Sequence, residues 1–328
     1  MVDGERLQPL LKELRIFTKS RPKSEPLPTR VDCVSLTKDQ LTEFQERGVV
    51  IARGILEYND LQPVIDEIAD FIEFRALELK AAGKIDDLKK EESFERRFGL
   101  LSKQSPEISQ GMDIMHRRGP AMFSFLSNDH LLQALESIVG PEITCSPIQH
   151  IRPKPPANEN GQGADSFNVV PWHQDAGVMM EEAENTNIVT CWLPLGDSTK
   201  EMGCLQVLPG INKVGYLKHH AAHGTTVVPG QIVEEKAIDL ECERGDVIFM
   251  HRFIPHRSMP NRSDQCRWSI DLRYQTTGQH TGRTGHPAFI VRSVSNPASV
   301  QSDYDTWCEN WSDALDNPKG FIGHRRDV

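Results

Sequence analysis

The feature that most constrains the fold of this chain is a change in sequence texture near residue 140. After this point, short runs of β-branched and other apolar residues follow one another closely, and glycine or proline residues separate them. Runs of strand length with turns between them are typical of antiparallel sandwiches and jelly rolls. The strand-sized segments are 143–151, 169–173, 188–195, 204–208, 224–228, 232–240, 246–250 and 267–275. They predict an antiparallel β-sandwich or a jelly roll (double-stranded β-helix) as the core of the protein.

The chain before this point shows a different periodicity. Apolar residues recur every three or four positions, which is the spacing of one buried face of an α-helix. The apolar run 49–52 predicts one strand within this part. A capping-box pattern formed by Thr37 and Gln40 marks the start of one helix. The helices expected from the spacing lie near residues 7–14, 37–48, 59–82 and 120–139.

The chain therefore divides into three parts that we expect to form one compact domain. Residues 1–140 are an N-terminal helical part packed on the core, residues 141–285 are the jelly-roll core, and residues 286–328 are a C-terminal tail. In the tail, Trp307 and Trp311 have helical spacing, and we expect both to pack against the body of the protein. The predicted fold class is α+β with a mainly β core and flanking N-terminal helices.

The composition excludes several classes of partner. Lys and Arg number 37 against 47 Asp and Glu, so the formal net charge is −10, and no basic stripe favours nucleic acid or an anionic membrane surface. No apolar run reaches the roughly 18 residues that a membrane helix needs. The N-terminus lacks a secretory pattern, and the seven cysteines include no CxxC pair. These features predict a soluble cytoplasmic protein. The oligomeric state stays open, with a homo-oligomer as one option.

The candidate chemistry begins at His173, Gln174 and Asp175, which directly follow an apolar run. Because side chains alternate along a strand, His173 and Asp175 would lie on one face and could form two ligands of a metal site. In a chain with 12 His, a triplet of this kind is expected by chance about once. The triplet alone therefore carries little weight.

Two later segments supply the other elements of such a site. The run 246–250 predicts a buried strand that leads towards His256, and Arg267 opens another strand a short distance further along the chain. Two His and one Asp on neighbouring strands can occupy one face of an octahedral metal and leave three positions open, as in non-haem Fe(II) oxygenases. A buried arginine near such a centre can donate two parallel hydrogen bonds to a carboxylate.

Other histidines and arginines fit this pattern less well. His251 stands further from Arg267 than His256 does, and no hydroxyl residue follows it at the second position, so His256 is the favoured ligand. The cluster of histidines at 219, 220 and 223 has no acid or cysteine at ligand spacing and is expected in a surface loop. Arg273 lies on the same strand face as Arg267, and we expect a structural role for it.

The segment from about residue 143 to residue 275 resembles the phytanoyl-CoA dioxygenase family of Fe(II)- and 2-oxoglutarate-dependent oxygenases. The matching pieces occur in the family's order, and the segment covers over a third of the chain. They are 151–155 (IRPKP), 172–175 (WHQD), 192–195 (WLPL), 203–210 (GCLQVLPG), 245–246 (GD) and 255–263 (PHRSMPNRS). The resemblance implies Fe(II), 2-oxoglutarate as cosubstrate and O2. The implied reaction is oxidation of a C–H bond of a small molecule, with release of succinate and CO2.

The resemblance also implies roles for individual residues. His173, Asp175 and His256 would bind the iron. Arg267 would pair with the distal carboxylate of 2-oxoglutarate, and Ser258 would hydrogen-bond the same group. Related halogenases lack the carboxylate ligand, so the presence of Asp175 favours hydroxylation or another oxygenase outcome.

Three further residues, Gln174, Trp192 and His150, match positions that line the cosubstrate pocket in relatives. The chain departs from the family at 209–212 (PGIN), where many members have Pro-Gly-Ser-His, so a role of that histidine is absent. Glu13 stands where a peroxisomal signal would have His or Gln, which favours the cytoplasm over the peroxisome.

Two other classes of function remain open from the sequence. A hydrolase could use the same two His and one Asp around zinc, but it would need neither Arg267 nor Ser258. A non-catalytic binding member of the fold is the other option, although a degenerate site would be expected to have lost at least one ligand. No motif identifies the substrate.

Overall fold

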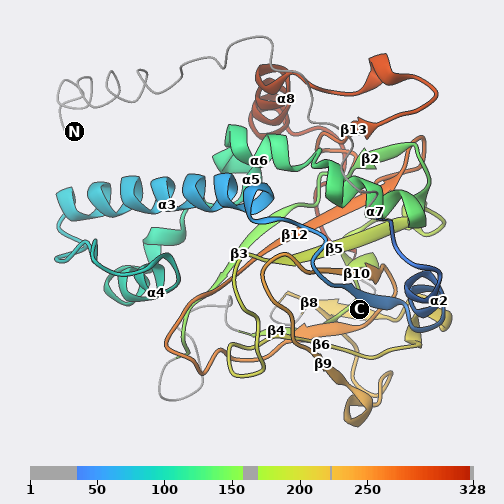
Figure 1. Ribbon diagram of the computed structural model, residues 1–328, viewed down its shortest axis with the longest axis horizontal. Coiled ribbons are helices and arrows are strands. Elements are labelled where there is room, and N and C mark those ends of the chain that lie inside the picture. Colours follow the sequence, from blue (N-terminus) through green and yellow to red (C-terminus); the bar gives the residue numbers. More distant parts are fainter. Residues whose placement is uncertain (1–34, 158–168, 222–223, 326–328) are drawn as a thin grey trace. The chain divides into compact units, whose positions relative to one another are not determined.

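The computed structural model describes residues 35–157, 169–221 and 224–325, which belong to one compact unit. The helix expected near residues 7–14 lies outside the described residues. A layer of helices, a large antiparallel sheet and a smaller sheet follow one another through the unit (Figure 1). This layering, with antiparallel sheets, is the double-stranded β-helix fold that the sequence predicts.

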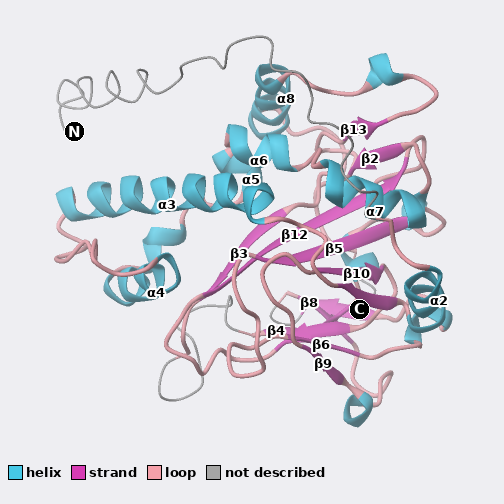
Figure 2. Cartoon of the chain, in the orientation of Figure 1, coloured by secondary structure: helices cyan, strands magenta, loops and turns pink. Residues whose placement is uncertain are grey.

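The large sheet has seven strands, and every pairing in it is antiparallel (Figure 2). β12 is its longest strand, with β5 along one edge and both β3 and β2 along the other. The strands in spatial order are β1 (Val49–Ala52), β10 (Val247–His251), β5 (Ile188–Pro194), β12 (Arg267–Thr276), β3 (His150–Lys154) together with β2 (Ile143–Cys145), and β13 (Phe289–Arg292).

The smaller sheet has four strands and lies across the large one. A separate two-stranded ribbon adjoins it, in which β7 (His219–Ala221) pairs with β8 (Thr225–Val227). The four strands of the smaller sheet in order are β4 (Val170–His173), β11 (His256–Ser258), β6 (Leu205–Val207) and β9 (Ile238–Leu240).

Apolar side chains fill the space on both sides of the large sheet. β5 is buried along its whole length, because helices cover one of its faces and the smaller sheet covers the other. The inner cluster between the sheets includes Trp192, Leu205, Val207, Ile248 and Met250. The larger cluster joins the other face of the sheet to the helices. The site described below therefore lies on a rigid support.

The helical layer is built largely from the N-terminal part, with one helix from the tail. Trp307 and Trp311 of that last helix are buried, as expected from their spacing. The α-helices are α2 (Lys38–Arg47), α3 (Tyr58–Ala81), α4 (Phe94–Gln104), α5 (Ile114–Arg117), α6 (Pro120–Phe125), α7 (Asp129–Val139) and α8 (Tyr304–Asp316).

The helix predictions are confirmed where periodicity and a capping signal agree. The capping box at Thr37 is present, and Gly48 ends α2 in the left-handed conformation. The segment 59–82 forms α3. The helix expected at 120–139 is instead two helices, because Asn128 accepts a hydrogen bond from the Leu131 N–H and starts α7 anew.

The strand predictions differ from the structure in three ways. The segment 143–151 forms two strands rather than one, since residues 146–149 leave the sheet between β2 and β3. Of the segment 232–240, only Ile238–Leu240 is a strand, because Glu234–Lys236 forms a 3-10 helix. The strands β7, β11 and β13 were not expected; β7 and β11 have no apolar run. Because β1 pairs with β10 and β13 pairs with β2, hydrogen bonds of the large sheet join all three parts of the chain.

Candidate active site

Three side chains with metal-binding atoms converge between the two sheets. His173 ends β4, and His256 lies directly opposite it on β11, with 4.1 Å between the two ring centroids. The His256 Nε2 lies 4.0 Å from Asp175 Oδ1. One potential ligand atom from each residue lies within 4.8 Å of the others, and in the described part of the chain no other group of His, Cys, Asp or Glu meets this criterion.

The backbone explains why His173 and Asp175 share a side. The hydrogen-bonded ladder of β4 ends at His173, but Gln174 stays extended, with φ −109° and ψ 143°. Asp175 then begins the 3-10 helix Asp175–Val178. The alternation of an extended chain therefore holds for the triplet, although Asp175 itself lies in a turn and not on the strand.

Both imidazoles present the same nitrogen to this centre. The His173 Nδ1 lies 2.9 Å from the Pro171 carbonyl oxygen, and the His256 Nδ1 lies 3.1 Å from the Ile254 carbonyl oxygen. A carbonyl only accepts, so each Nδ1 carries the hydrogen and each Nε2 keeps its lone pair. Burial and the neighbouring His256 lower the pKa of His173 to about 3, which keeps its imidazole neutral at neutral pH.

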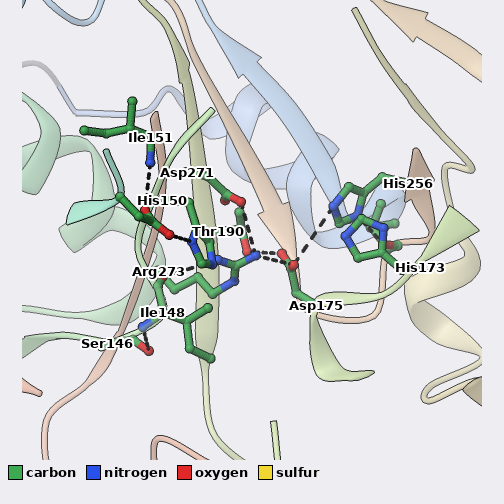
Figure 3. Close-up of polar contacts among 12 residues, drawn as sticks. Ser146, Ile148, His150, Ile151, His173, Asp175, Thr190, His256, Asp271 and Arg273 are labelled. Atoms are coloured by element: carbon green, nitrogen blue, oxygen red, sulfur yellow. Dashed lines mark hydrogen bonds and ion pairs between the residues drawn. The ribbon is translucent and has the colours of Figure 1, made fainter. Parts of the chain in front are cut away.

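Both oxygens of the Asp175 carboxylate are held by side chains of the large sheet. Arg273 donates to Oδ1 and Thr190 donates to Oδ2. These two donors face each other across β12 and β5, so the register of the sheet sets their position. Figure 3 shows the carboxylate between the Arg273 guanidinium on one side and the two imidazoles on the other. Burial would raise the pKa of Asp175, but the charge of Arg273 lowers it overall, so the carboxylate stays ionised.

Arg273 therefore does more than the structural role expected from the sequence. Its guanidinium also lies 3.5 Å from Asp271 and donates to the Ile148 carbonyl at 3.3 Å. The only sequence signal for this contact was the shared strand face of Arg267 and Arg273. The partner of Arg273 could not be identified from the sequence, because Asp175 lies far away along the chain.

A first cavity opens on one side of His173 and His256, and Arg267 lies in its wall beside Trp192 and Ser258. The Arg267 side chain is 3% exposed, its Nη1 donates to the Gly203 carbonyl at 3.0 Å, and its guanidinium carbon lies 5.0 Å from the Trp192 ring centroid. Among the described residues, no carboxylate forms an ion pair with it. Burial lowers the pKa of Arg267 to about 10, so it remains charged at neutral pH. A buried cation without a carboxylate suits an anionic ligand.

A second cavity, of about 430 Å³, adjoins the first, and both have Arg152, Val170, His173 and Asp271 in their walls. Asp175 and Arg273 lie in its wall, together with His150 and Arg283. The His150 Nδ1 is 2.8 Å from Asp113 Oδ2. His150 was expected to line the cosubstrate pocket beside Arg267, but it lines this second cavity instead, because it sits at the far end of β3 from the residue paired with Arg267.

Gln174 does not line either cavity, contrary to expectation. Alternation along the extended chain turns its side chain away from its two neighbours. The amide Nε2 donates to the carbonyls of Gly215 and Phe253, at 2.9 and 2.7 Å, and Oε1 accepts from the Leu217 N–H at 2.7 Å. The Gln174 side chain therefore connects the triplet to the backbone at 215–217 and at Phe253.

Two other histidines considered from the sequence, His251 and His219, lie outside the ligand cluster. The His251 Nδ1 accepts from the Phe253 N–H at 3.2 Å, in agreement with the choice of His256. His219 is fully buried, and its Nε2 accepts from the Gln174 N–H at 3.0 Å. The expectation of a surface position was therefore wrong for His219, which supports the backbone of the triplet.

The donor set fits ferrous iron. Two imidazole nitrogens and one ionised carboxylate on one side of a site form the facial arrangement typical of non-haem Fe(II), and two cavities lie beside these ligand atoms. In the described part of the chain, no helix combines the length and apolar character that a membrane span requires.

Comparisons with known proteins agree with this geometry. A family model described as phytanoyl-CoA dioxygenase matches residues 44–269. The 1-deoxypentalenic acid 11-beta-hydroxylase of Streptomyces exfoliatus is 28% identical over 280 residues, which cover 79% of this chain and 89% of that protein. The human peroxisomal phytanoyl-CoA dioxygenase is 24% identical over 259 residues, which cover 75% of this chain and 70% of that protein.

Solved structures resemble the fold. The apo form of the non-haem monooxygenase ThoJ has a TM-score of 0.53 at 19% identity, covering 84% of this chain and 94% of that one. The epimerase SnoN, in complex with Fe3+, α-ketoglutarate and nogalamycin RO, has a TM-score of 0.50 at 17% identity, covering 75% of this chain and 87% of that one. At these identities the likeness shows the shared fold.

Proposed function

The chain belongs to the phytanoyl-CoA dioxygenase family and is an Fe(II)- and 2-oxoglutarate-dependent oxygenase, and on this premise we propose that it hydroxylates a C–H bond of a small organic molecule. The observation that carries the proposal is the convergence of His173, Asp175 and His256 beside a cavity that contains Arg267, a buried cation with no carboxylate partner among the described residues. Succinate and CO2 would be the products derived from the cosubstrate.

In this proposal, His173 and His256 bind the iron through Nε2, and Asp175 binds it through a carboxylate oxygen. When bound, the iron together with 2-oxoglutarate and O2 supplies the oxidising power for C–H cleavage. The backbone carbonyls that accept from each Nδ1 fix both rings in the required tautomer. Arg273 and Thr190 keep the carboxylate ionised and oriented.

Arg267 is the proposed anchor of the cosubstrate. A guanidinium matches a carboxylate in shape and charge, and here its position is fixed by the Gly203 carbonyl and the Trp192 ring. Gly203 has φ +73°, and a Cβ at this position would overlap the Met259 carbonyl oxygen, so only glycine suits this approach. Ser258 lies in the same wall and is proposed to donate to the same carboxylate.

The second cavity is the proposed place of the organic substrate. His173 lies in the walls of both cavities and Asp175 in the wall of the second, so a molecule there would lie beside the proposed metal ligands. Asp175 would supply a carboxylate to the metal, which favours hydroxylation.

A cytoplasmic location is also part of the proposal. Six cysteines in the described part of the chain are free thiols, and five of them are buried. Free thiols are typical of proteins in a reducing compartment.

The test is oxidation of 2-oxoglutarate by the purified protein. Protein loaded anaerobically with Fe(II) and then given O2 and 2-oxoglutarate should form succinate, and a library of small organic acids, terpenoids and amino-acid derivatives should contain compounds that accelerate this reaction. His256→Ala is the control that should form none. Hydrolysis of a library compound with Zn(II) in the absence of O2, without succinate formation, would contradict the proposal and support a zinc hydrolase.

A further inference from the structure

The wall of the second cavity contains an arginine that the proposed chemistry does not use. Arg283 lies in the loop after β12 and is 8% exposed. Its Nε donates to the Val178 carbonyl at 2.9 Å. Val178 ends the 3-10 helix that begins with Asp175, so Arg283 is tied to the turn that carries a proposed iron ligand.

The loop that carries Arg283 is packed closely against the chain after this turn. The Met180 N–H donates to the Gly282 carbonyl at 3.1 Å. Gly282 has φ +66°, and a Cβ there would lie 2.8 Å from the Met179 Cβ. The Arg283 N–H is also held by Thr281 Oγ1 at 3.2 Å. These contacts hold the backbone of Arg283 in place. The guanidinium therefore has little freedom to turn out of the cavity into solvent.

In the described part of the chain, no carboxylate balances the charge of Arg283. The two described carboxylates that line the cavity, Asp175 and Asp271, both pair with Arg273. Among the described residues, Arg283 forms no ion pair within 4 Å. Burial and the like charge of Arg273 lower the pKa of Arg283 to about 10, so it is charged at neutral pH. An unbalanced buried cation is costly unless a ligand supplies the negative charge.

The first cavity offers an internal comparison. Arg267 is also buried, also donates to one backbone carbonyl and also lacks a carboxylate among the described residues. There the expected partner is the distal carboxylate of 2-oxoglutarate. Arg283 has the same set of properties in the neighbouring cavity, whose wall also contains His173.

We propose that Arg283 binds a carboxylate of the substrate, so that the oxidised molecule is an organic acid. This inference rests on the proposed function, since it assumes that the second cavity receives the substrate. The side chains of Ile148, Val169 and Val178 contribute apolar surface to the same wall. They suit an acid with an apolar body, whose carboxylate meets Arg283 while its carbon skeleton extends towards the iron ligands.

The test measures binding, because the substrate is not identified. The full-length protein is loaded with Ni(II), which replaces Fe(II) without turnover, and with saturating 2-oxoglutarate, which keeps the Arg267 cavity filled. Benzoate and cyclohexanecarboxylate are then titrated by calorimetry, and benzamide and cyclohexanecarboxamide serve as neutral counterparts of the same shape. The proteins compared are wild type, Arg283→Gln, Arg283→Lys and Arg47→Gln, an exposed arginine of α2.

The wild type should bind at least one acid about 10-fold or more tightly than its amide, since hydrogen bonds to charged groups have effects of this size. Arg283→Gln should abolish this preference, Arg283→Lys should keep part of it, and Arg47→Gln should keep all of it. Equal binding of acids and amides, no binding of either acid, or a preference that survives in Arg283→Gln overturns the inference. If wild type fails to bind Ni(II) or 2-oxoglutarate, the proposed function itself fails, and the inference fails with it.

Discussion

The two cavities beside His173 are built in different ways. Every described residue in the wall of the Arg267 cavity belongs to a strand of one of the two sheets. The Arg283 cavity also has strand residues in its wall, but it adds residues from a turn, from loops and from the tail, among them Val178, Gly224, Arg283 and His324. His324 reaches the cavity from the C-terminal tail, where its Nδ1 lies 2.6 Å from Thr225 Oγ1.

This difference separates the part of the site that is proposed to bind iron and cosubstrate from the part that is proposed to select the substrate. Strand registers fix the relative positions of His173, His256, Trp192, Ser258 and Arg267, so the side of the site that is proposed to bind the cosubstrate rests on the two sheets. Loops and chain ends tolerate insertion and replacement without disturbing the sheets. The second cavity can therefore change its ligand while the first one stays constant.

The largest effect is expected at the proposed metal ligands. His256→Ala removes one of the proposed metal ligands from β11, and metal affinity should fall by more than the ~10- to 100-fold typical of changes outside the ligand set. The stoichiometry of Fe(II) or Ni(II) after dialysis checks this. His251→Ala is the matched control, since His251 lies outside the cluster. Equal loss of metal in both variants would mean that His256 has no special role.

The next largest effect distinguishes the Arg267 cavity from the Arg283 cavity. Arg267→Ala should weaken 2-oxoglutarate binding by about 30-fold or more, the usual result of removing one partner of a buried charged pair, and should leave metal content nearly intact. Calorimetry with the Ni(II) protein gives both quantities. Arg283→Gln should leave 2-oxoglutarate affinity within about twofold. A reversed pattern, in which Arg283 and not Arg267 controls the cosubstrate, would exchange the roles of the two cavities.

A smaller effect concerns the support of Asp175 by the large sheet. Thr190→Val keeps the shape of the side chain but removes the hydroxyl that donates to the carboxylate, so metal affinity should fall by about 10-fold. Thr276→Val is the control. Thr276 also lies in the large sheet, on β12, but its hydroxyl donates to the Val139 carbonyl and not to Asp175. Unchanged metal affinity in Thr190→Val would show that Arg273 positions the carboxylate without help.

The smallest expected effect is on the pH dependence of the free energy of unfolding, and it concerns a residue next to Arg267. Lys154 pairs with Arg267 across β3 and β12, is buried, and donates to the Met259 carbonyl at 2.7 Å. Burial, reinforced by the charge of Arg267, lowers the pKa of Lys154 from 10.5 to about 6. Between these values the unfolded chain binds one more proton than the folded one, so this group makes the free energy of unfolding rise with pH.

Lys154→Met should remove that contribution and flatten the dependence by at most about 1.4 kcal/mol per pH unit between pH 7 and pH 9. Urea unfolding at three pH values measures the slope. Lys103→Met, an exposed position in α4, should leave it unchanged. A slope in Lys154→Met as steep as in wild type would show that Lys154 is charged in the folded protein.

The contrast between strand residues and loop residues also explains which features the sequence could predict. Alternation within the triplet, the apolar run before His256 and the short separation between His256 and Arg267 are properties of strands, and they led to His173, Asp175, His256 and Arg267. Trp192 and Ser258 followed from the family resemblance, and both line the expected cavity. The jelly-roll core and the helices with capping signals could be predicted for the same reason, since periodicity is local.

The sequence could not place residues whose role depends on distant contacts. Arg283 lies in a loop without periodicity, and nothing in its neighbours along the chain indicates that Val178 lies beside it. Gln174 was misplaced because the resemblance gives a position but not the three backbone groups that bind the side chain. β11 has three residues and no apolar alternation, so only its two partner strands identify it as a strand.

The most direct test of the account is a crystal structure of the protein with Ni(II) and 2-oxoglutarate. The account predicts one metal ion at ~2.0–2.2 Å from the Nε2 atoms of His173 and His256 and from a carboxylate oxygen of Asp175, distances usual for such ligands. It also predicts the distal carboxylate of 2-oxoglutarate on the guanidinium of Arg267. A metal bound by other residues, or a cosubstrate lying against Arg283, would contradict it.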